Sequence, residues 1–133
     1  MTKLKPLHSV VVDLGYLGIN KPFLALVEEY SGFKQAWPLP NSKTGAVTEK
    51  LDKFFSAMGF PVVMRSDGGP CFRHTFQEWC KSRGIKHVKS APGHHESNGA
   101  VEVSIRELKA LMKTTQASGV PLQKLILQLN NMI

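Results

Sequence analysis

The sequence predicts a single α/β domain in which three antiparallel strands precede helices that alternate with two further short strands. Apolar, β-branched runs dominate the first third of the chain, separated by turns too short to hold a helix. Apolar residues then recur with the 3.6-residue period of an amphipathic helix. The length of 133 residues and the hydrophobic content of 42% suit one domain with its own core.

The first strand is predicted over residues 8–14, a β-branched run that ends at the carboxylate of Asp13. A second strand is predicted over residues 23–29 and a third over residues 33–39, with a Tyr-Ser-Gly turn at 30–32 between them. Connections as short as these favour an antiparallel meander.

A helix is predicted next, over roughly residues 43–58, because its apolar positions follow the helical period. Ser42 is the expected N-cap, since a hydroxyl accepts a hydrogen bond from an unpaired N–H of the first turn. Gly59 stands where a left-handed C-terminal residue is expected.

The middle of the chain repeats this alternation with shorter elements. A strand over residues 61–64 leads into the Asp-Gly-Gly segment at 67–69, and a second helix is predicted over about 74–83. A short strand follows over residues 85–88. Residues 90–98 hold a proline, a glycine and several polar side chains, which predicts a mobile loop.

The helix predicted from about Gly99 has two distinct faces. Its apolar positions must face the core and are Val101, Ile105, Leu108 and Met112. The neighbouring face carries one acid followed by three cations at i+4, i+7 and i+11, which are Glu102, Arg106, Lys109 and Lys113. A final amphipathic helix is predicted after Pro121.

Composition narrows the kind of partner. The formal net charge is +7 and the pI is about 9.6, which favours a polyanion, nucleic acid before membrane. We expect no membrane association, because no apolar run approaches the ~20 residues of a span. The two cysteines, Cys71 and Cys80, form no zinc-type spacing and are expected to be reduced thiols in an intracellular protein, with Cys80 a buried small hydrophobe.

Three carboxylates from separated segments carry the predicted chemistry: Asp13, Asp67 and Glu102. Together they can coordinate two hard divalent cations, Mg²⁺ or Mn²⁺, through oxygen. Two ions ~3.5–4 Å apart can activate a hydroxyl and stabilise the leaving oxygen of a phosphodiester. Taken singly, Asp67 also suits an ordinary Asp-Gly turn, and Glu102 an ordinary solvated helix.

The ordered motifs resemble the integrase core of retroviruses and long-terminal-repeat retrotransposons, most closely the Ty3/gypsy-like class. The resemblance rests on Ser-Asp-Gly-Gly-Pro-Cys-Phe at 66–72 and Ser-Asn-Gly-x-x-Glu at 97–102. Shorter matches lie at 12–14, 30–32 and 59–61, so it extends over nearly the whole chain.

The resemblance implies an RNase H-like fold, with a five-stranded mixed sheet flanked by helices. It also implies a metal triad of Asp13, Asp67 and Glu102, with two Mg²⁺ or Mn²⁺ ions as cofactors. The last two acids are 35 positions apart, one fewer than the family usually has. The residues expected to bind DNA are Ser97, Asn98, Arg106, Lys109 and Lys113.

The chain departs from the family pattern just before the second motif. The family usually has Pro-Gln there, whereas this chain has His95 and Glu96. Glu96 is therefore a rival third ligand, although its loop position and shorter spacing disfavour it. His94 and His95 invite a zinc interpretation, but adjacent loop histidines more often face solvent or phosphate. The large aromatic residues are expected in the core or a dimer interface; they are Trp37, Phe54, Phe55 and Trp79.

The predicted function is DNA integration: 3′-end processing followed by strand transfer of element DNA into target DNA. Expected partners are double-stranded DNA and further copies of the chain, as a homodimer or higher multimer, in the nucleus if the element is eukaryotic. We expect residues 1–133 to be one catalytic core domain without the zinc-binding and C-terminal DNA-binding domains. Two alternatives stay open: a host-adopted remnant that binds DNA or protein without cutting, and a bacterial insertion-sequence transposase core.

Overall fold

The computed structural model describes residues 7–89, 99–119 and 121–131, and it confirms the predicted order of elements. The elements, in chain order, are β1 (Ser9–Tyr16), β2 (Pro22–Glu28), β3 (Lys34–Pro38), α1 (Thr44–Met58), β4 (Val63–Ser66), the 3₁₀ turn η1 (Pro70–Phe72), α2 (His74–Ser82), β5 (Lys86–Lys89), α3 (Gly99–Ser118) and α4 (Leu122–Asn131).

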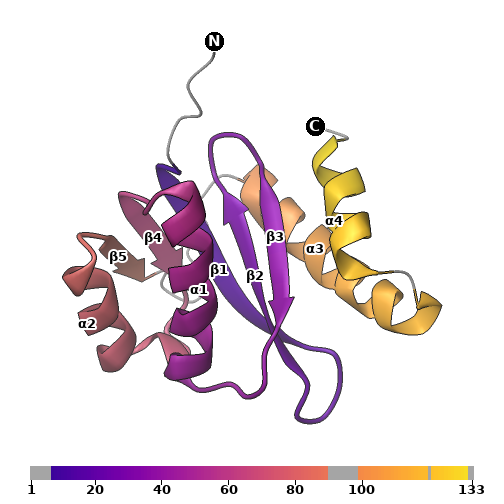
Figure 1. Cartoon of the computed structure of the whole chain (residues 1–133), viewed down its shortest axis with the longest axis horizontal. Helices are drawn as coiled ribbons and strands as arrows, with labels where there is room; N and C mark the ends of the chain where they lie inside the picture. Colours follow the sequence, from indigo (N-terminus) through magenta and orange to yellow (C-terminus); the bar gives the residue numbers. More distant parts are fainter. Residues whose placement is uncertain (1–6, 90–98, 120, 132–133) are drawn as a thin grey trace.

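The five strands form one mixed sheet in the order β3-β2-β1-β4-β5 (Figure 1). The three N-terminal strands form the predicted antiparallel meander. β4 pairs parallel with β1, and β5 pairs parallel with β4. Parallel pairing requires a long crossover, which α1 provides between β3 and β4 and α2 between β4 and β5. The predicted five-stranded mixed sheet flanked by helices is therefore confirmed.

Helices cover both faces of the sheet, so the core has two layers (Figure 1). Val10 and Val12 of β1 pack into the cluster beneath α1 and α2. Val11, between them, packs into the cluster beneath α3 and α4. This alternation follows from the two-residue period of a strand. Central strand β2 is buried along its whole length because it has neighbours on both edges and helices on both faces.

The first strand is longer than the sequence predicted, which corrects the position of the first acid. β1 continues to Tyr16, so Asp13 lies inside the strand instead of at its end. The extension follows from pairing with β2, which runs from Val10 opposite Glu28 to Tyr16 opposite Pro22. Pairing with β4 stops earlier, so Asp13 lies where the parallel neighbour has already left the sheet.

The predicted N-cap of the first helix is wrong. The N-cap position belongs to Lys43, and no side chain caps the helix. The approach is shaped instead by Asn41, whose Oδ1 accepts the N–H of Lys43 at 2.9 Å. Thr44 then donates its hydroxyl to the carbonyl of Cys71 at 2.9 Å, which ties the start of α1 to η1. At the other end Gly59 has the predicted positive φ of 96°, but its ψ of 143° lies outside the left-handed helical region.

Elements after α1 are shifted by one or two residues from the sequence prediction. β4 begins at Val63, two residues late, because the backbone of residues 62 and 63 first bonds to the carbonyl of His8. α2 ends at Ser82, and Gly84 has a φ of 70°, as expected of a residue that ends a helix.

The two C-terminal helices confirm the predicted apolar face. Val101, Leu108 and Met112 are buried against the sheet, and Ile105 is partly buried beside them. α4 begins directly after Pro121 and packs beside α3 and β3. There Asn130 bonds to both the N–H and the carbonyl of Lys34, and so occupies the open hydrogen-bonding edge of β3.

The aromatic residues expected to pack do so. Phe55 is fully buried, and Trp37, Phe54 and Trp79 are partly buried against the same cluster. Cys80 is buried as predicted, and both cysteines are free thiols. None of the described helices is long and apolar enough to cross a bilayer.

Candidate metal and nucleic-acid site

Asp13 lies on β1, and Asp67 directly follows β4, the parallel neighbour of β1. The register between β1 and β4 joins Ser9 to Val63 and Val11 to Arg65, a constant offset of 54 residues. At the same offset Asp13 corresponds to Asp67, one residue beyond the end of β4. Adjacent strands in a sheet are about 4.8 Å apart. Two acids that are 54 residues apart in the sequence are therefore brought to the same edge of the sheet.

Asp13 faces the helix that carries the third predicted acid. Asp13 is two residues from Val11 on β1, so both side chains point to the same face of the sheet. Val11 packs into the cluster beneath α3 and α4. Lys109 of α3 reaches across to it, with 2.6 Å between Nζ and Asp13 Oδ2. The second oxygen, Oδ1, accepts the N–H of Leu14 at 2.9 Å. The side chains of Asp13 and Lys109 are only 27% and 34% exposed, so the pair is partly shielded from water.

Asp67 is exposed, and its orientation is set by the loop that follows it. Its Oδ1 accepts the N–H of Gly69 at 2.9 Å, a local turn of the kind Asp often forms. A Cβ at Gly69 would lie 3.0 Å from that same oxygen, so the absence of a side chain there keeps room for the carboxylate. The ordinary turn interpretation of Asp67 is thus correct for the local geometry. It is compatible with a ligand role, because Oδ2 is turned away from that bond.

The residue before Asp67 is anchored by a histidine. Ser66 is buried, and its hydroxyl lies 2.6 Å from Nε2 of His87 on β5. The His87 ring stands edge-on to Phe76, 5.0 Å between centroids. Burial, and then the positive charge of Lys89, lower the pKa of His87 below its usual value. No local sequence signal points to this contact, because Ser66 and His87 come together only when β4 pairs with β5.

The thiol of Cys71 reports where the two aspartates lie. Burial, followed by the negative charges of Asp67 and Asp13, raises its pKa to about 11. Both carboxylates are therefore close enough to act on one buried atom. The same shift shows that Cys71 is a protonated thiol at neutral pH and not a nucleophile.

Glu102 lies in the first turn of α3, on the side of the helix that also bears Lys109. Seven residues separate the two, which is two helical turns or about 10 Å along the axis. Its side chain is partly exposed. Glu102 and Lys109 thus share one face of α3, and Lys109 reaches Asp13 from that face.

The carboxylate oxygens of the three acids suit a hard divalent cation, but the structure does not bring the three side chains into one metal-binding cluster. Within residues 7–89, 99–119 and 121–131, no group of three or more His, Cys, Asp or Glu side chains is arranged to hold a metal ion. The three acids offer only carboxylate oxygens, which is the chemistry that Mg²⁺ and Mn²⁺ prefer. At Asp13 a metal ion would compete with the ammonium group of Lys109, which is bound to Oδ2.

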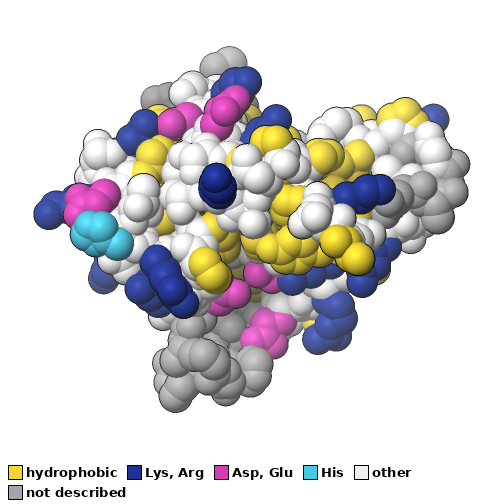
Figure 2. Space-filling model, turned by 90° about the horizontal axis from the view of Figure 1, so that it is seen from below, with side chains coloured by type: hydrophobic (Ala, Val, Ile, Leu, Met, Phe, Trp, Pro, Cys, Tyr) yellow, Lys and Arg dark blue, Asp and Glu magenta, His cyan; other side chains and the backbone are white. Residues whose placement is uncertain are grey.

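Two further cations continue the face of α3. Arg106 and Lys113 are both exposed, as predicted for residues that would meet a polyanion. Figure 2 shows acidic side chains gathered on the underside of the molecule, with Lys and Arg side chains beside them. Such a face presents carboxylates for metal and cations for phosphate within one surface.

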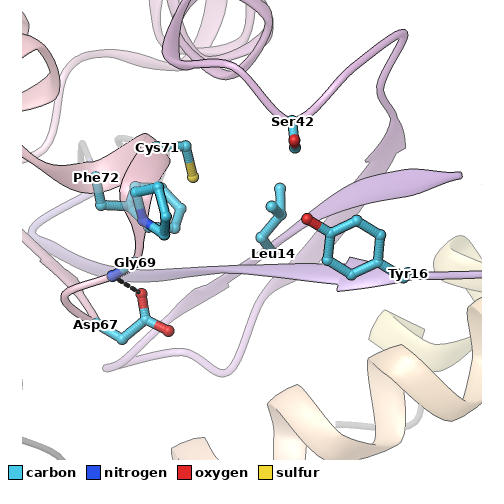
Figure 3. A pocket seen from close by; sticks show the side chains of 8 residues that line it. Leu14, Tyr16, Ser42, Asp67, Gly69, Cys71 and Phe72 are labelled. Carbon is cyan, nitrogen blue, oxygen red and sulfur yellow. Dashed lines mark hydrogen bonds between the residues drawn. The ribbon is translucent and has the colours of Figure 1, made fainter. Parts of the chain in front are cut away.

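A pocket of about 220 Å³ opens beside Asp67. Leu14 and Tyr16 of β1 form one wall, Ser42 lies above, and the segment from Asp67 to Phe72 closes the other side (Figure 3). Ser42, which was predicted to cap α1, lines this pocket instead. Its lining is mainly apolar, and the polar side chains that reach it are those of Tyr16, Ser42 and Asp67.

Several predicted residues lie outside the described part of the chain. They are the DNA-binding candidates Ser97 and Asn98, the rival ligand Glu96, and the pair His94 and His95.

Comparison with known proteins gives a consistent result. Residues 3–95 match the family model described as "Integrase core domain". That match includes Asp13 and Asp67 and ends before Glu102. The chain is 32% identical over 116 residues to the Pro-Pol polyprotein of simian foamy virus type 3, covering 82% of this chain and about one tenth of the polyprotein.

Solved structures agree on the fold. The catalytic core domain of BIV integrase superposes with a TM-score of 0.71 at 24% identity, covering 90% of this chain and 78% of that one. A chain of the simian T-cell lymphotropic virus intasome gives a TM-score of 0.71 at 23% identity, covering 98% and 49%. The fold is thereby the RNase H-like fold of integrase catalytic cores.

Proposed function

Because the chain belongs to the integrase core domain family, of the retroviral type, we propose that it is a metal-dependent polynucleotidyl transferase acting on DNA. Its reactions would be trimming of element DNA at the 3′ end and transfer of that end into target DNA. The observation that supports this proposal is that Asp13 lies on β1 within reach of α3, the helix that bears Glu102, while Asp67 directly follows β4, the parallel neighbour of β1.

Asp13, Asp67 and Glu102 are the residues that would hold the cofactor, two Mg²⁺ or Mn²⁺ ions. Such ions, when bound, activate the attacking hydroxyl and stabilise the leaving oxygen of the phosphodiester. The protein contributes rigid supports: β1 fixes Asp13, the Ser66–His87 contact fixes the backbone before Asp67, and the buried face of α3 fixes Glu102.

The cations on α3 would align the DNA. Arg106 and Lys113 are exposed and can neutralise phosphates on either side of the reacting bond. Ser97 and Asn98 precede this helix in the sequence and are proposed to contact the same strand. Both reactions are in-line displacements, so positioning of the two DNAs is the main task of the protein.

Partners follow from this chemistry. The substrate is double-stranded DNA, both element ends and target, and the proposed assembly is a homodimer or higher multimer in the nucleus of a eukaryotic host. The chain spans about one tenth of the polyprotein it resembles, and we propose that it supplies the catalytic core of that larger product. The Ty3/gypsy-like class remains our assignment within the family.

One observation favours a second candidate, a host-adopted domain that binds DNA without cutting it. The described acids do not form a three-ligand group, and Asp13 is already neutralised by Lys109. A remnant freed from selection for catalysis would keep the fold and the basic face while losing the closed triad.

A branched DNA that mimics the joined product separates the two candidates, because reversal of joining demands least from other domains. We expect resolution of the branch in the presence of Mn²⁺ or Mg²⁺ and its loss in Glu102→Gln, which retains the size of the side chain but removes its charge and one acceptor oxygen. Glu107→Gln, an exposed acid on the same helix, is the matched control and should retain activity. Tight DNA binding with no resolution in any metal would instead support the non-catalytic domain.

A further inference from the structure

The first acid of the candidate triad already has a cation bound to it. Lys109 Nζ lies 2.6 Å from Asp13 Oδ2, and the backbone of Leu14 donates to Oδ1 at 2.9 Å. Each oxygen of the carboxylate therefore has one partner. A charged hydrogen bond of this length is among the stronger kinds in proteins.

The position of Lys109 is determined by the packing of its helix. Leu108, its immediate neighbour, is fully buried, and Met112, three residues on, is almost so. These two residues fix the depth and rotation of α3 against the sheet, so the Lys109 side chain leaves the helix beside β1. The side chain itself is 34% exposed, so a path to solvent stays open to its ammonium group.

An ammonium at this distance conflicts with a divalent ion at the same carboxylate. Two cations that share one carboxylate lie within a few ångströms of each other and repel strongly in a partly shielded site. Two results are thus connected: the described acids do not form a metal-holding group, and one of them is bound to Lys109. Closing the triad requires the lysine to leave.

We infer that Lys109 is an exchangeable counter-ion of Asp13, which must be released from the carboxylate when a divalent ion binds there. The released ammonium joins the exposed cationic face formed by Arg106 and Lys113, where the strongest available partner is a DNA phosphate. Metal binding and DNA binding would then favour each other, because both stabilise the state in which Lys109 has left Asp13. This inference rests on the proposed metal-binding function.

The test measures metal binding without DNA and without catalysis. Mn²⁺ is titrated into the purified chain, and free Mn²⁺ is followed by electron paramagnetic resonance, with calorimetry as a second readout. The set is wild type, Lys109→Ala, Lys109→Arg, Lys113→Ala and Asp13→Asn. Lys113→Ala removes the same charge from the same helix one turn further on, so it reports the long-range effect of net charge alone.

We expect Lys109→Ala to bind Mn²⁺ roughly three- to ten-fold more tightly than wild type. The substitution removes the partly exposed ion pair with Asp13 and also removes a positive charge that repels the metal ion. Lys109→Arg keeps the ion pair and should stay near wild type, and Lys113→Ala should change the affinity by less than about two-fold. Circular dichroism of each variant verifies that the fold is retained.

Equal affinities for Lys109→Ala and Lys113→Ala would overturn the counter-ion role while leaving the metal site intact, provided that Asp13→Asn abolishes binding. A different pattern would contradict the proposed function itself: no Mn²⁺ binding by either wild type or Lys109→Ala beyond that of Asp13→Asn. Binding that appears only in Lys109→Ala would support the inference in its strongest form.

Discussion

A partly buried histidine, His87, links the chemistry of single residues to the stability of the fold. His87 accepts or donates one hydrogen bond, to Ser66, and its Nδ1 is buried without a described partner. Protonation would place a charge among Phe76, the Ser66 hydroxyl and nearby Lys89. Burial and Lys89 therefore keep the ring neutral and lower its pKa.

This shift predicts a pH dependence of stability. Below pH ~6.5 His87 binds a proton in the unfolded chain but stays neutral in the folded chain until the pH reaches its lowered pKa. The free energy of unfolding therefore falls as the pH falls. The loss ends below the lowered pKa of the folded state. We expect His87→Gln to remove this part of the pH dependence between about pH 7 and 5, measured by urea denaturation. Exposed His74→Gln is the control; an unchanged slope in His87→Gln would refute the assignment.

At this scale the sequence predicts which residues matter better than what they contact. Asp13 and Asp67 could be chosen because each carboxylate borders an apolar strand. The partner of Asp13 could not, because Lys109 reaches it only after α3 has packed across the sheet. The prediction that Lys109 belongs to an exposed cationic face was therefore incomplete.

At the scale of elements, the extension of β1 past Asp13 depends on one glycine. A Cβ at Gly15 would lie 2.3 Å from Cζ of Phe23, which is buried on the neighbouring strand. The three nearest atoms all belong to that ring, so an alanine at this position requires the whole Phe23 side chain to shift. The absence of a side chain at Gly15 thus lets the Phe23 ring lie over β1, where it packs in the cluster beneath α3.

Gly15→Ala should therefore destabilise the fold by roughly 1–3 kcal/mol through overpacking. Gly45→Ala is the matched control, because nothing lies within 4 Å of its added Cβ and α1 gains a better helix former. Chemical denaturation of both variants gives the comparison. Equal stability of the two would show that the Phe23 ring can move aside.

Element boundaries show where local signals fail. Helical periodicity predicted α1, α3 and the burial of Val101, Leu108 and Met112, because packing on a sheet requires one apolar face. The N-cap was missed because Thr44 bonds to Cys71, a contact across 27 residues that no local pattern reveals. β4 was placed early because its start is set by bonds to His8 and not by its own apolar run.

At the scale of the whole molecule, the charge of +7 has to be concentrated by folding to be useful. α3 contributes to this by presenting Arg106 and Lys113, both exposed, on one helix. Association with DNA should then depend on salt through the number of phosphates that these side chains neutralise.

Lys113→Ala should weaken duplex DNA binding and reduce the slope of log affinity against log salt by about 0.9. Lys53→Ala removes the same charge from α1, where the lysine is paired with Glu49, and should leave that slope unchanged. Fluorescence anisotropy at several salt concentrations measures both. The same decrease in both variants would mean that DNA does not follow α3.

The fold class followed from the sequence because strand and helix periods alternate in an unambiguous order. The relative placement of Asp13 and Asp67 did not, since it depends on the register between two parallel strands joined by a long crossover. The family resemblance supplied the triad, and the structure supplied the reason that two of its members meet.

The central claim is that Asp13, Asp67 and Glu102 together hold divalent metal, and crystals of the chain soaked in Mn²⁺ test it most directly. Anomalous scattering at the manganese edge locates the ion without reference to activity. We predict a manganese peak beside the carboxylates of Asp13, Asp67 and Glu102, with Lys109 turned away. Manganese elsewhere, or none at these acids with the Asp13–Lys109 pair intact at saturating Mn²⁺, would contradict the account.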